Sequence, residues 1–110
     1  MTDLKLTGYV ATENDIKSTV RDYLDHRGIF HFHLMGCMGS YKGAPDRIAL
    51  YKTPTGRVYT LCLEMKRVGY SQSPDQLVFE ERANLAGAVY LVVRKLEDLI
   101  DCLKELDKNG

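Results

Sequence analysis

Three charged residues in the middle of the chain have the types and spacing of a hydrolytic metal site. Asp46 follows a proline, and Glu64 and Lys66 form a Glu-x-Lys pattern within a later apolar run. Successive side chains of a strand point to opposite faces, so Glu64 and Lys66 would share one face. A buried strand seldom carries an acid and a base there unless each has a partner. Two carboxylates facing a lysine can hold a divalent cation and a water beside a phosphodiester, which is the chemistry of a metal-dependent nuclease.

The metal that this pattern favours is Mg²⁺, which prefers hard oxygen ligands, keeps several waters and often takes only one or two carboxylates from the protein. Asp46 and Glu64 are the predicted carboxylate ligands, and the main-chain carbonyl of Met65 is a candidate for a third oxygen. Lys66 would orient or deprotonate the attacking water, or neutralise charge on the phosphate. Because a metal can itself activate water, Lys66 need not be the general base.

Each of these residues also has a structural interpretation when it is taken alone. Asp46 could end a Pro-Asp turn, and Glu64 with Lys66 could form an ion pair on an exposed strand. Their combination on two neighbouring strands favours the functional interpretation. His31 and His33 also share a strand face, but there an edge or polar-face pair is favoured over metal binding.

Two further polar residues occupy predicted helix starts. Gln76 lies three residues after Ser73, which is the arrangement of a capping box. Glu13 lies in the first turn of an earlier helix, where acids are favoured. Helix capping alone would explain both positions. Both side chains could also point into the site, the Gln76 amide toward the water on the metal and Glu13 as an additional metal or water contact.

The elements that must position these residues alternate between helices and strands. Thr12 and Ser73 are predicted N-caps, and Pro54 with Gly56 marks the turn of a hairpin. The apolar spacing predicts helices over about 13–27, 74–87 and 96–106, and strands over about 29–34, 46–52, 57–66 and 88–93.

This order, α-β-β-β-α-β-α, predicts one α/β domain with a mixed central sheet flanked by helices. The helix after residue 72 would cross over the sheet and make strand 88–93 parallel to another strand. The fully apolar character of 88–93 predicts a position at the sheet centre.

The size and composition of the chain fit a single globular domain. Its 110 residues are 45% apolar, which is ordinary for such a domain, and no apolar run approaches the roughly 20 residues of a membrane span. The N-terminus lacks the layout of a signal peptide. Cys37, Cys62 and Cys102 form neither a disulfide framework nor a metal-binding pair. The expected location is therefore the reducing cytoplasm, with no membrane partner.

Charge is unevenly distributed, although the formal net charge is zero. Basic residues predominate between residues 36 and 71, and acids predominate after Lys95. Solvated faces of opposite sign would explain this, but the basic stretch coincides with the Asp/Glu/Lys pattern and thereby favours DNA as the partner. The candidate DNA contacts are Ser40, Tyr41 and Lys42 in the glycine-rich segment 36–43, together with Arg47 and Arg67.

Four short motifs together resemble the VRR-NUC branch of the PD-(D/E)xK nucleases. They are Gly-Ala-Pro-Asp at 43–46, Leu-Glu-Met-Lys at 63–66, Ser-Pro-Asp-Gln at 73–76 and Val-Val-Arg-Lys at 92–95. The resemblance covers roughly residues 12–103 and predicts a single nuclease domain over 1–110, with its core at about 12–107. Lys95 departs from the arginine of the family signature, which keeps the charge but not a bidentate contact.

The resemblance implies a restriction-endonuclease-like core and Mg²⁺- or Mn²⁺-dependent hydrolysis of phosphodiesters. It implies that Asp46, Glu64 and Lys66 are the catalytic triad and that Gln76 and Glu13 support it. Stand-alone members of this size are similar to bacteriophage or bacterial Holliday-junction resolvases, which act as homodimers. We therefore expect a homodimeric, structure-selective endonuclease that cuts branched DNA in the cytoplasm of a bacterial or phage-infected cell.

Two other functions compete with this expectation. A sequence-specific restriction nuclease would need base-reading elements, for which the chain has little room. A non-catalytic DNA-binding module would keep the scaffold without the activity, but the complete set of aspartate, glutamate and lysine argues against it.

Overall fold

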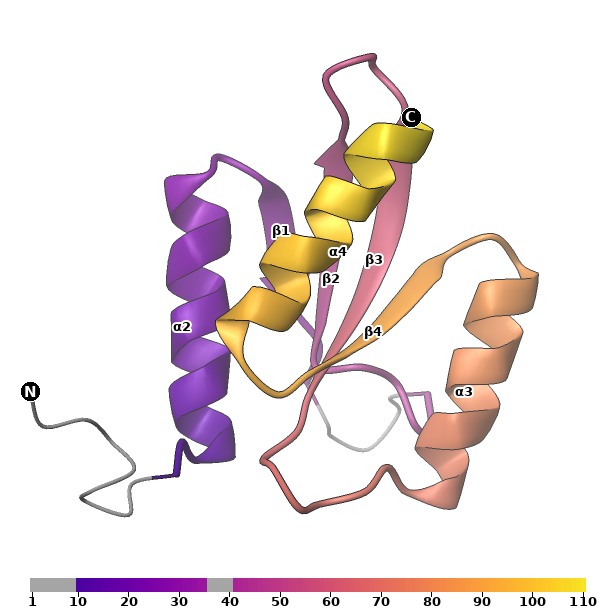
Figure 1. The fold of residues 1–110 in the computed structure, drawn as a ribbon. Helices are drawn as coiled ribbons and strands as arrows, with labels where there is room; N and C mark the ends of the chain where they lie inside the picture. The colour runs from indigo at the N-terminus through magenta and orange to yellow at the C-terminus, as the bar shows by residue number, and fades with distance from the viewer. Residues whose placement is uncertain (1–9, 36–40) are drawn as a thin grey trace, which may run out of the picture.

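The elements of the protein follow the order that the sequence predicts (Figure 1). The computed structural model describes residues 10–35 and 41–110. Three helices and four strands span these residues: α2 Glu13–His26, β1 Phe30–His33, β2 Arg47–Lys52, β3 Val58–Met65, α3 Pro74–Leu85, β4 Val89–Val93 and α4 Leu96–Asn109. The predicted mixed α/β fold with a four-stranded sheet flanked by helices is confirmed.

The four strands form one mixed sheet in the order β1-β2-β3-β4. Strands β1, β2 and β3 are antiparallel neighbours, and β4 runs parallel to β3. The predicted hairpin joins β2 to β3, with the Thr53 amide donating to the Arg57 carbonyl. Helix α3 makes the predicted crossover to the parallel strand β4.

The predicted central position of strand 88–93 is wrong, because β4 ends the sheet formed by the described residues. Its apolar sequence has another cause. Helices α3 and α4 both contact β4, Val93 is buried in the main core, and Tyr90, on the alternate face, meets Phe79 of α3. Two helices, rather than two neighbouring strands, therefore exclude water from β4.

The core lies between one face of the sheet and the helices α2 and α4. Its largest fully buried side chains include Leu24 of α2, Leu61, Leu63 and Met65 of β3, and Leu103 of α4. The alternate β3 residues Cys62 and Glu64 are buried as well. The second half of β3 is therefore covered on both faces, which places Glu64 in an environment that disfavours an unpartnered charge.

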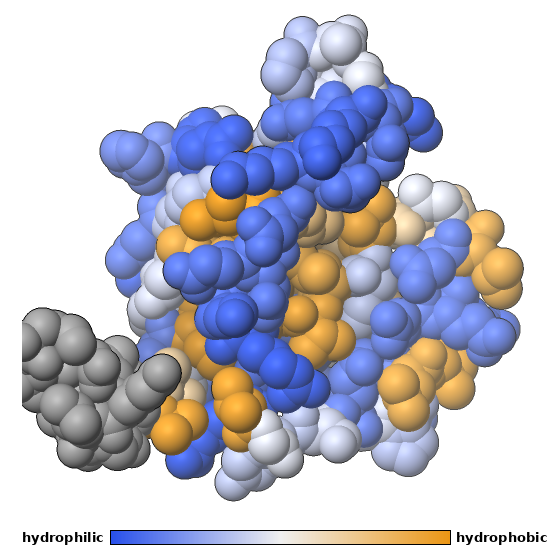
Figure 2. Space-filling view, viewed as in Figure 1, coloured by the Kyte–Doolittle hydropathy of each residue, from blue (hydrophilic) through white to orange (hydrophobic). Residues whose placement is uncertain are grey.

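Apolar side chains remain on the surface in several regions. Phe30, Phe32 and Leu50 share the sheet face opposite the core and are 65%, 43% and 40% exposed. In Figure 2, hydrophilic side chains follow α4, and apolar side chains lie on either side of it and again over α3. No helix among the described residues has both the length and the apolar character that crossing a membrane requires.

Candidate active site

Asp46 and Glu64 meet at one end of the β2–β3 hairpin. Arg47 is paired with Leu63 in this antiparallel ladder, so the preceding residue, Asp46, comes next to Glu64. The Asp46 Oδ2 atom accepts a hydrogen bond from the Met65 amide at 2.8 Å. This bond fixes the Asp46 carboxylate against the strand that carries Glu64. It also brings the Met65 main chain into the site.

Glu64 is the most deeply buried ionisable group of the site, at 2% exposure. Its Oε2 atom accepts a hydrogen bond from Gln76 Nε2 at 3.0 Å and lies 3.7 Å from Lys66 Nζ. Burial, reinforced by the negative charge of Asp46 and opposed by Lys66, raises the Glu64 pKa to about 7. The aspartate, glutamate and lysine of the predicted set therefore do converge.

The second oxygen of Glu64 has no partner among the described residues. Glu64 Oε1 is buried and accepts no hydrogen bond there. An unsatisfied buried polar atom costs free energy on the order of 1–3 kcal/mol, so the site favours a ligand that can approach this oxygen. A divalent cation held by Asp46 and Glu64 fits the requirement, because both are hard oxygen donors.

Gln76 is the helix-capping residue that the sequence predicts, and its side chain also donates a hydrogen bond to Glu64. The Gln76 side-chain carbonyl accepts a hydrogen bond from the Ser73 backbone amide at 2.9 Å. The Gln76 backbone amide donates to Ser73 Oγ at 3.2 Å, and the two bonds form a capping box. The remaining side-chain NH₂ group donates to Glu64. Capping and contact with Glu64 are compatible because the amide carries an acceptor and a donor at separate ends.

Among the described residues, Glu13 is connected to the site through Lys17, a residue that sequence analysis missed. Lys17 Nζ lies 3.1 Å from Glu13 Oε2 and 3.5 Å from Asp46 Oδ1. Burial alone would lower the Lys17 pKa, but Asp46 and Glu13 together raise it. The spacing of Glu13 and Lys17, one helical turn apart, was the available signal.

A tight loop contact holds Asp46 close to α3. Gly43 has a φ of 77°, and a Cβ atom there would lie 2.2 Å from the Asp75 carbonyl oxygen. Pro45 is fully buried. Only glycine tolerates both this backbone conformation and this approach. The loop therefore brings Asp46 and Gln76, which come from different elements, to one site.

The Val-Val-Arg-Lys motif supports the site from outside it. Arg94 Nη1 donates to the carbonyls of Arg67 and Tyr70, at 3.0 and 2.8 Å. These bonds hold the loop that follows Lys66. The Lys95 residue, which departs from the family signature, is the N-cap of α4.

The predicted DNA contacts have different surroundings. Ser40 lies outside the described residues. Tyr41 packs on Phe79 and accepts a hydrogen bond from Arg82. Lys42 and Arg67 are exposed, and Arg47 donates to His31 on β1, which is an edge strand of the described sheet.

Two pockets flank Asp46. One, of about 280 Å³, lies toward α2 and includes Lys17 and Arg47. The other, of about 250 Å³, lies toward α3 and includes Tyr41 and Gln76. Asp46 thus lines a pocket on each of its two sides.

Metal binding here would depend on main-chain and water oxygens as well as on carboxylates. Within residues 10–35 and 41–110, no group of three or more histidine, cysteine, aspartate or glutamate side chains is arranged to hold a metal ion. Two carboxylates with one carbonyl and waters would be a typical magnesium ligand set.

Comparison of the chain with protein-family models, with curated proteins and with solved structures gives no match. The family resemblance therefore stays a prediction from four motifs.

Proposed function

We propose that this protein is a metal-dependent endonuclease that hydrolyses phosphodiester bonds in branched DNA. The observation that carries the proposal is the buried Glu64 carboxylate. One of its oxygens is held by Gln76 and approached by Lys66, and the other has no partner among the described residues. An ionisable group whose pKa is strongly shifted by burial and by specific neighbouring charges is typical of a functional site.

Asp46 and Glu64 would hold Mg²⁺ or Mn²⁺, with the Met65 carbonyl as a further ligand. When bound, such an ion acts as a Lewis acid that polarises the phosphate and makes water a stronger nucleophile. The Met65 amide orients Asp46 by its hydrogen bond. The Gln76 amide orients Glu64 in the same way.

Lys66 is the residue proposed to act on water and phosphate. Its ammonium group lies next to Glu64 and is only partly exposed, so it can hold a water by hydrogen bonding or offset negative charge on the phosphate. Gln76 and Glu13 support the site, Glu13 through Lys17.

Branched DNA and a homodimer are proposed from the VRR-NUC resemblance and from a geometric argument. A chain with one site can cut two strands of a junction symmetrically only if a second chain supplies a second site. The proposed place of action is the cytoplasm of a bacterial or phage-infected cell.

The test is a cleavage panel of single-stranded, linear duplex, flap and four-way DNA with Mg²⁺, Mn²⁺ or a chelator. We expect metal-dependent cleavage of the branched substrates. Glu64→Gln and Asp46→Asn should each reduce the rate by at least about 100-fold, as loss of transition-state electrostatics does. Glu105→Gln, an exposed acid paired with Lys108 on α4, is the matched control and should cut normally. Cleavage by Glu64→Gln with unchanged metal dependence would refute the assignment.

A further inference from the structure

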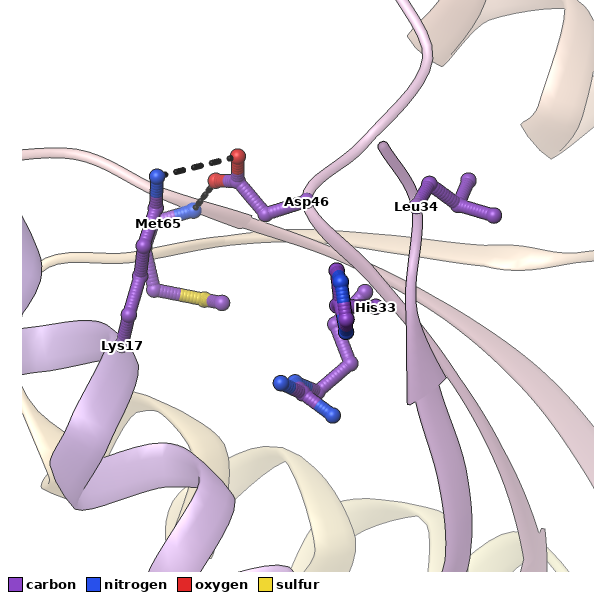
Figure 3. A pocket seen from close by; sticks show the side chains of 6 residues that line it. Lys17, His33, Leu34, Asp46 and Met65 are labelled. Carbon is purple, nitrogen blue, oxygen red and sulfur yellow. Dashed lines mark hydrogen bonds and ion pairs between the residues drawn. The ribbon is translucent and has the colours of Figure 1, made fainter. Parts of the chain in front are cut away.

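A second group of cationic side chains lies beside the candidate active site, on the α2 side of Asp46. The pocket there is lined by Lys17, His33, Leu34, Asp46, Arg47 and Met65. Figure 3 shows Lys17 and Asp46 in contact at one side of this pocket and His33 on the other. The pocket thus combines two cations and an imidazole with the one carboxylate that it shares with the active site.

Arg47 is held in place by a chain of two short hydrogen bonds. Its Nη1 atom lies 2.7 Å from His31 Nδ1, and His31 Nε2 lies 2.6 Å from Asp25 Oδ1. A guanidinium can only donate, so His31 Nδ1 is the acceptor, and His31 Nε2 carries the proton that is donated to Asp25. The His31 side chain is only 8% exposed. This neutral tautomer orients the Arg47 guanidinium without neutralising its charge.

Arg47 forms no ion pair with a carboxylate in the described part of the chain, whereas Lys17 pairs with Glu13 and Asp46. Burial, followed by the like charge of Arg21, lowers the Arg47 pKa. A guanidinium stays protonated at neutral pH nevertheless. Its planar set of N–H donors matches two oxygens of a phosphate, and an anion in the pocket would compensate its charge.

We infer that this pocket binds a backbone phosphodiester of DNA next to the one that is cut, with Arg47 as its main ligand and His31 as the positioning residue for Arg47. The inference rests on the proposed function, since Asp46 links the pocket to the hydrolytic site. Contacts to a flanking phosphate carry no sequence information, but they fix the register of the strand. Structure-selective cutting requires that register.

Equilibrium binding of a fluorescent four-way DNA in chelator tests the pocket without any cleavage. Arg47→Gln should weaken binding about tenfold and reduce the slope of log affinity against log salt by about one, as expected for one lost phosphate contact. Arg57→Gln is the matched control, because it removes the same charge from an exposed arginine that stacks on Tyr59 in the β2–β3 hairpin. Equal effects of the two substitutions on DNA binding would contradict the inference that this pocket binds a DNA phosphate.

His31→Leu tests the positioning role through a double-mutant cycle. It should weaken DNA binding in the wild type but add little to Arg47→Gln, since both changes remove the same oriented contact. Additive effects would show that His31 is only structural and overturn that role. Thermal unfolding of each variant identifies any that does not fold. If one does not, Lys17→Gln removes a different charge that lines the same pocket, and it should also weaken DNA binding.

Two further outcomes distinguish a DNA phosphate in this pocket from a free anion, and distinguish this inference from the proposed nuclease function. In the first outcome, the wild-type protein binds inorganic phosphate, Arg47→Gln does not, and both proteins bind DNA equally well. The pocket then binds a free anion rather than DNA, and the inference fails. If DNA binding depends on Arg47 but no metal supports cleavage, the phosphate pocket stands and the proposed nuclease function fails.

Discussion

The Glu64 carboxylate is buried, and one of its oxygens has no hydrogen-bond partner among the described residues. Its pKa of about 7 means that, in the metal-free folded protein, the protonated and ionised forms are both populated near neutral pH. A cation at the unpartnered oxygen would favour the ionised form instead. Ionising this buried carboxylate costs free energy, and a bound metal would offset that cost.

The stability of the metal-free protein should therefore fall as the pH rises from about 4.5 to about 7. The Glu64 pKa rises from its ordinary 4.5 to about 7 on folding, so between these values the folded state binds more protons than the unfolded state. The expected loss of unfolding free energy is on the order of 2–3 kcal/mol, at about 1.4 kcal/mol per unit. Urea unfolding in chelator at pH 5 and pH 8 measures it.

Glu64→Gln is the control for this pH dependence. Because its amide does not ionise, this variant should lose much less stability between the two pH values. A wild-type stability that rises over the same interval would contradict the argument.

Gln76 offers a second test at the level of single residues, because it combines two contacts. Ser73→Ala removes the N-cap hydroxyl alone and should cost about 1 kcal/mol while leaving cleavage nearly normal. Gln76→Ala should cost a similar amount of stability and also reduce cleavage at least tenfold, because Glu64 loses its donor. Parallel urea unfolding and cleavage rates distinguish the two. Equal cleavage by both variants would reduce Gln76 to a helix cap.

At the scale of elements, the site depends on how the loop before β2 meets the start of α3. Neither element contains the site alone. Asp46 comes from the loop, Glu64 from β3 and Gln76 from α3, and the close approach of Gly43 to Asp75 keeps them together.

Gly43→Ala should therefore disrupt both stability and activity. A Cβ atom would meet the Asp75 main chain, in a backbone region that already disfavours alanine. We expect a loss of at least about 2 kcal/mol together with reduced cleavage. Gly56→Ala is the matched control, since Gly56 also has a positive φ but nothing within 4 Å of the added Cβ. It should cost only about 1 kcal/mol and leave cleavage intact.

At the scale of the whole molecule, charge distribution matters more than net charge. The chain is formally neutral, yet Lys17, Arg47 and Lys66 gather around Asp46 and Glu64. A local cluster of this kind can bind a phosphate backbone even when distant acids cancel the sum.

Binding of four-way DNA by the wild-type protein should accordingly weaken steeply with salt. Neutralised phosphates release condensed counterions, so log affinity should fall linearly with log salt concentration. Anisotropy titrations over a series of salt concentrations provide the slope. An affinity that is insensitive to salt would contradict a phosphate-dominated interface.

The proposed homodimer can be tested by the mass of the protein in solution. Light scattering of the purified protein should give twice the chain mass of 12.5 kDa, because symmetric cutting needs two sites. A monomer at the concentrations that support junction cleavage would contradict the proposal.

The sequence by itself determined the elements and their order. The N-caps Thr12 and Ser73, the hairpin turn and the apolar periodicity of α2 and α4 are local features, because each depends on residues that are near one another in the chain. The approach of Glu64 to Lys66 was also predictable, because strand alternation places both on one face.

Only the tertiary structure decided what surrounds these residues. One such feature is the edge position of β4 in the described sheet. Others are contacts between separate elements: Lys17 with Asp46, and the hydrogen bonds from Asp25 through His31 to Arg47. Local spacing is fixed by backbone geometry, whereas contacts between elements depend on how helices pack on the sheet. That packing brought Lys17, which the sequence did not single out, into the same pocket as Arg47, a predicted DNA contact.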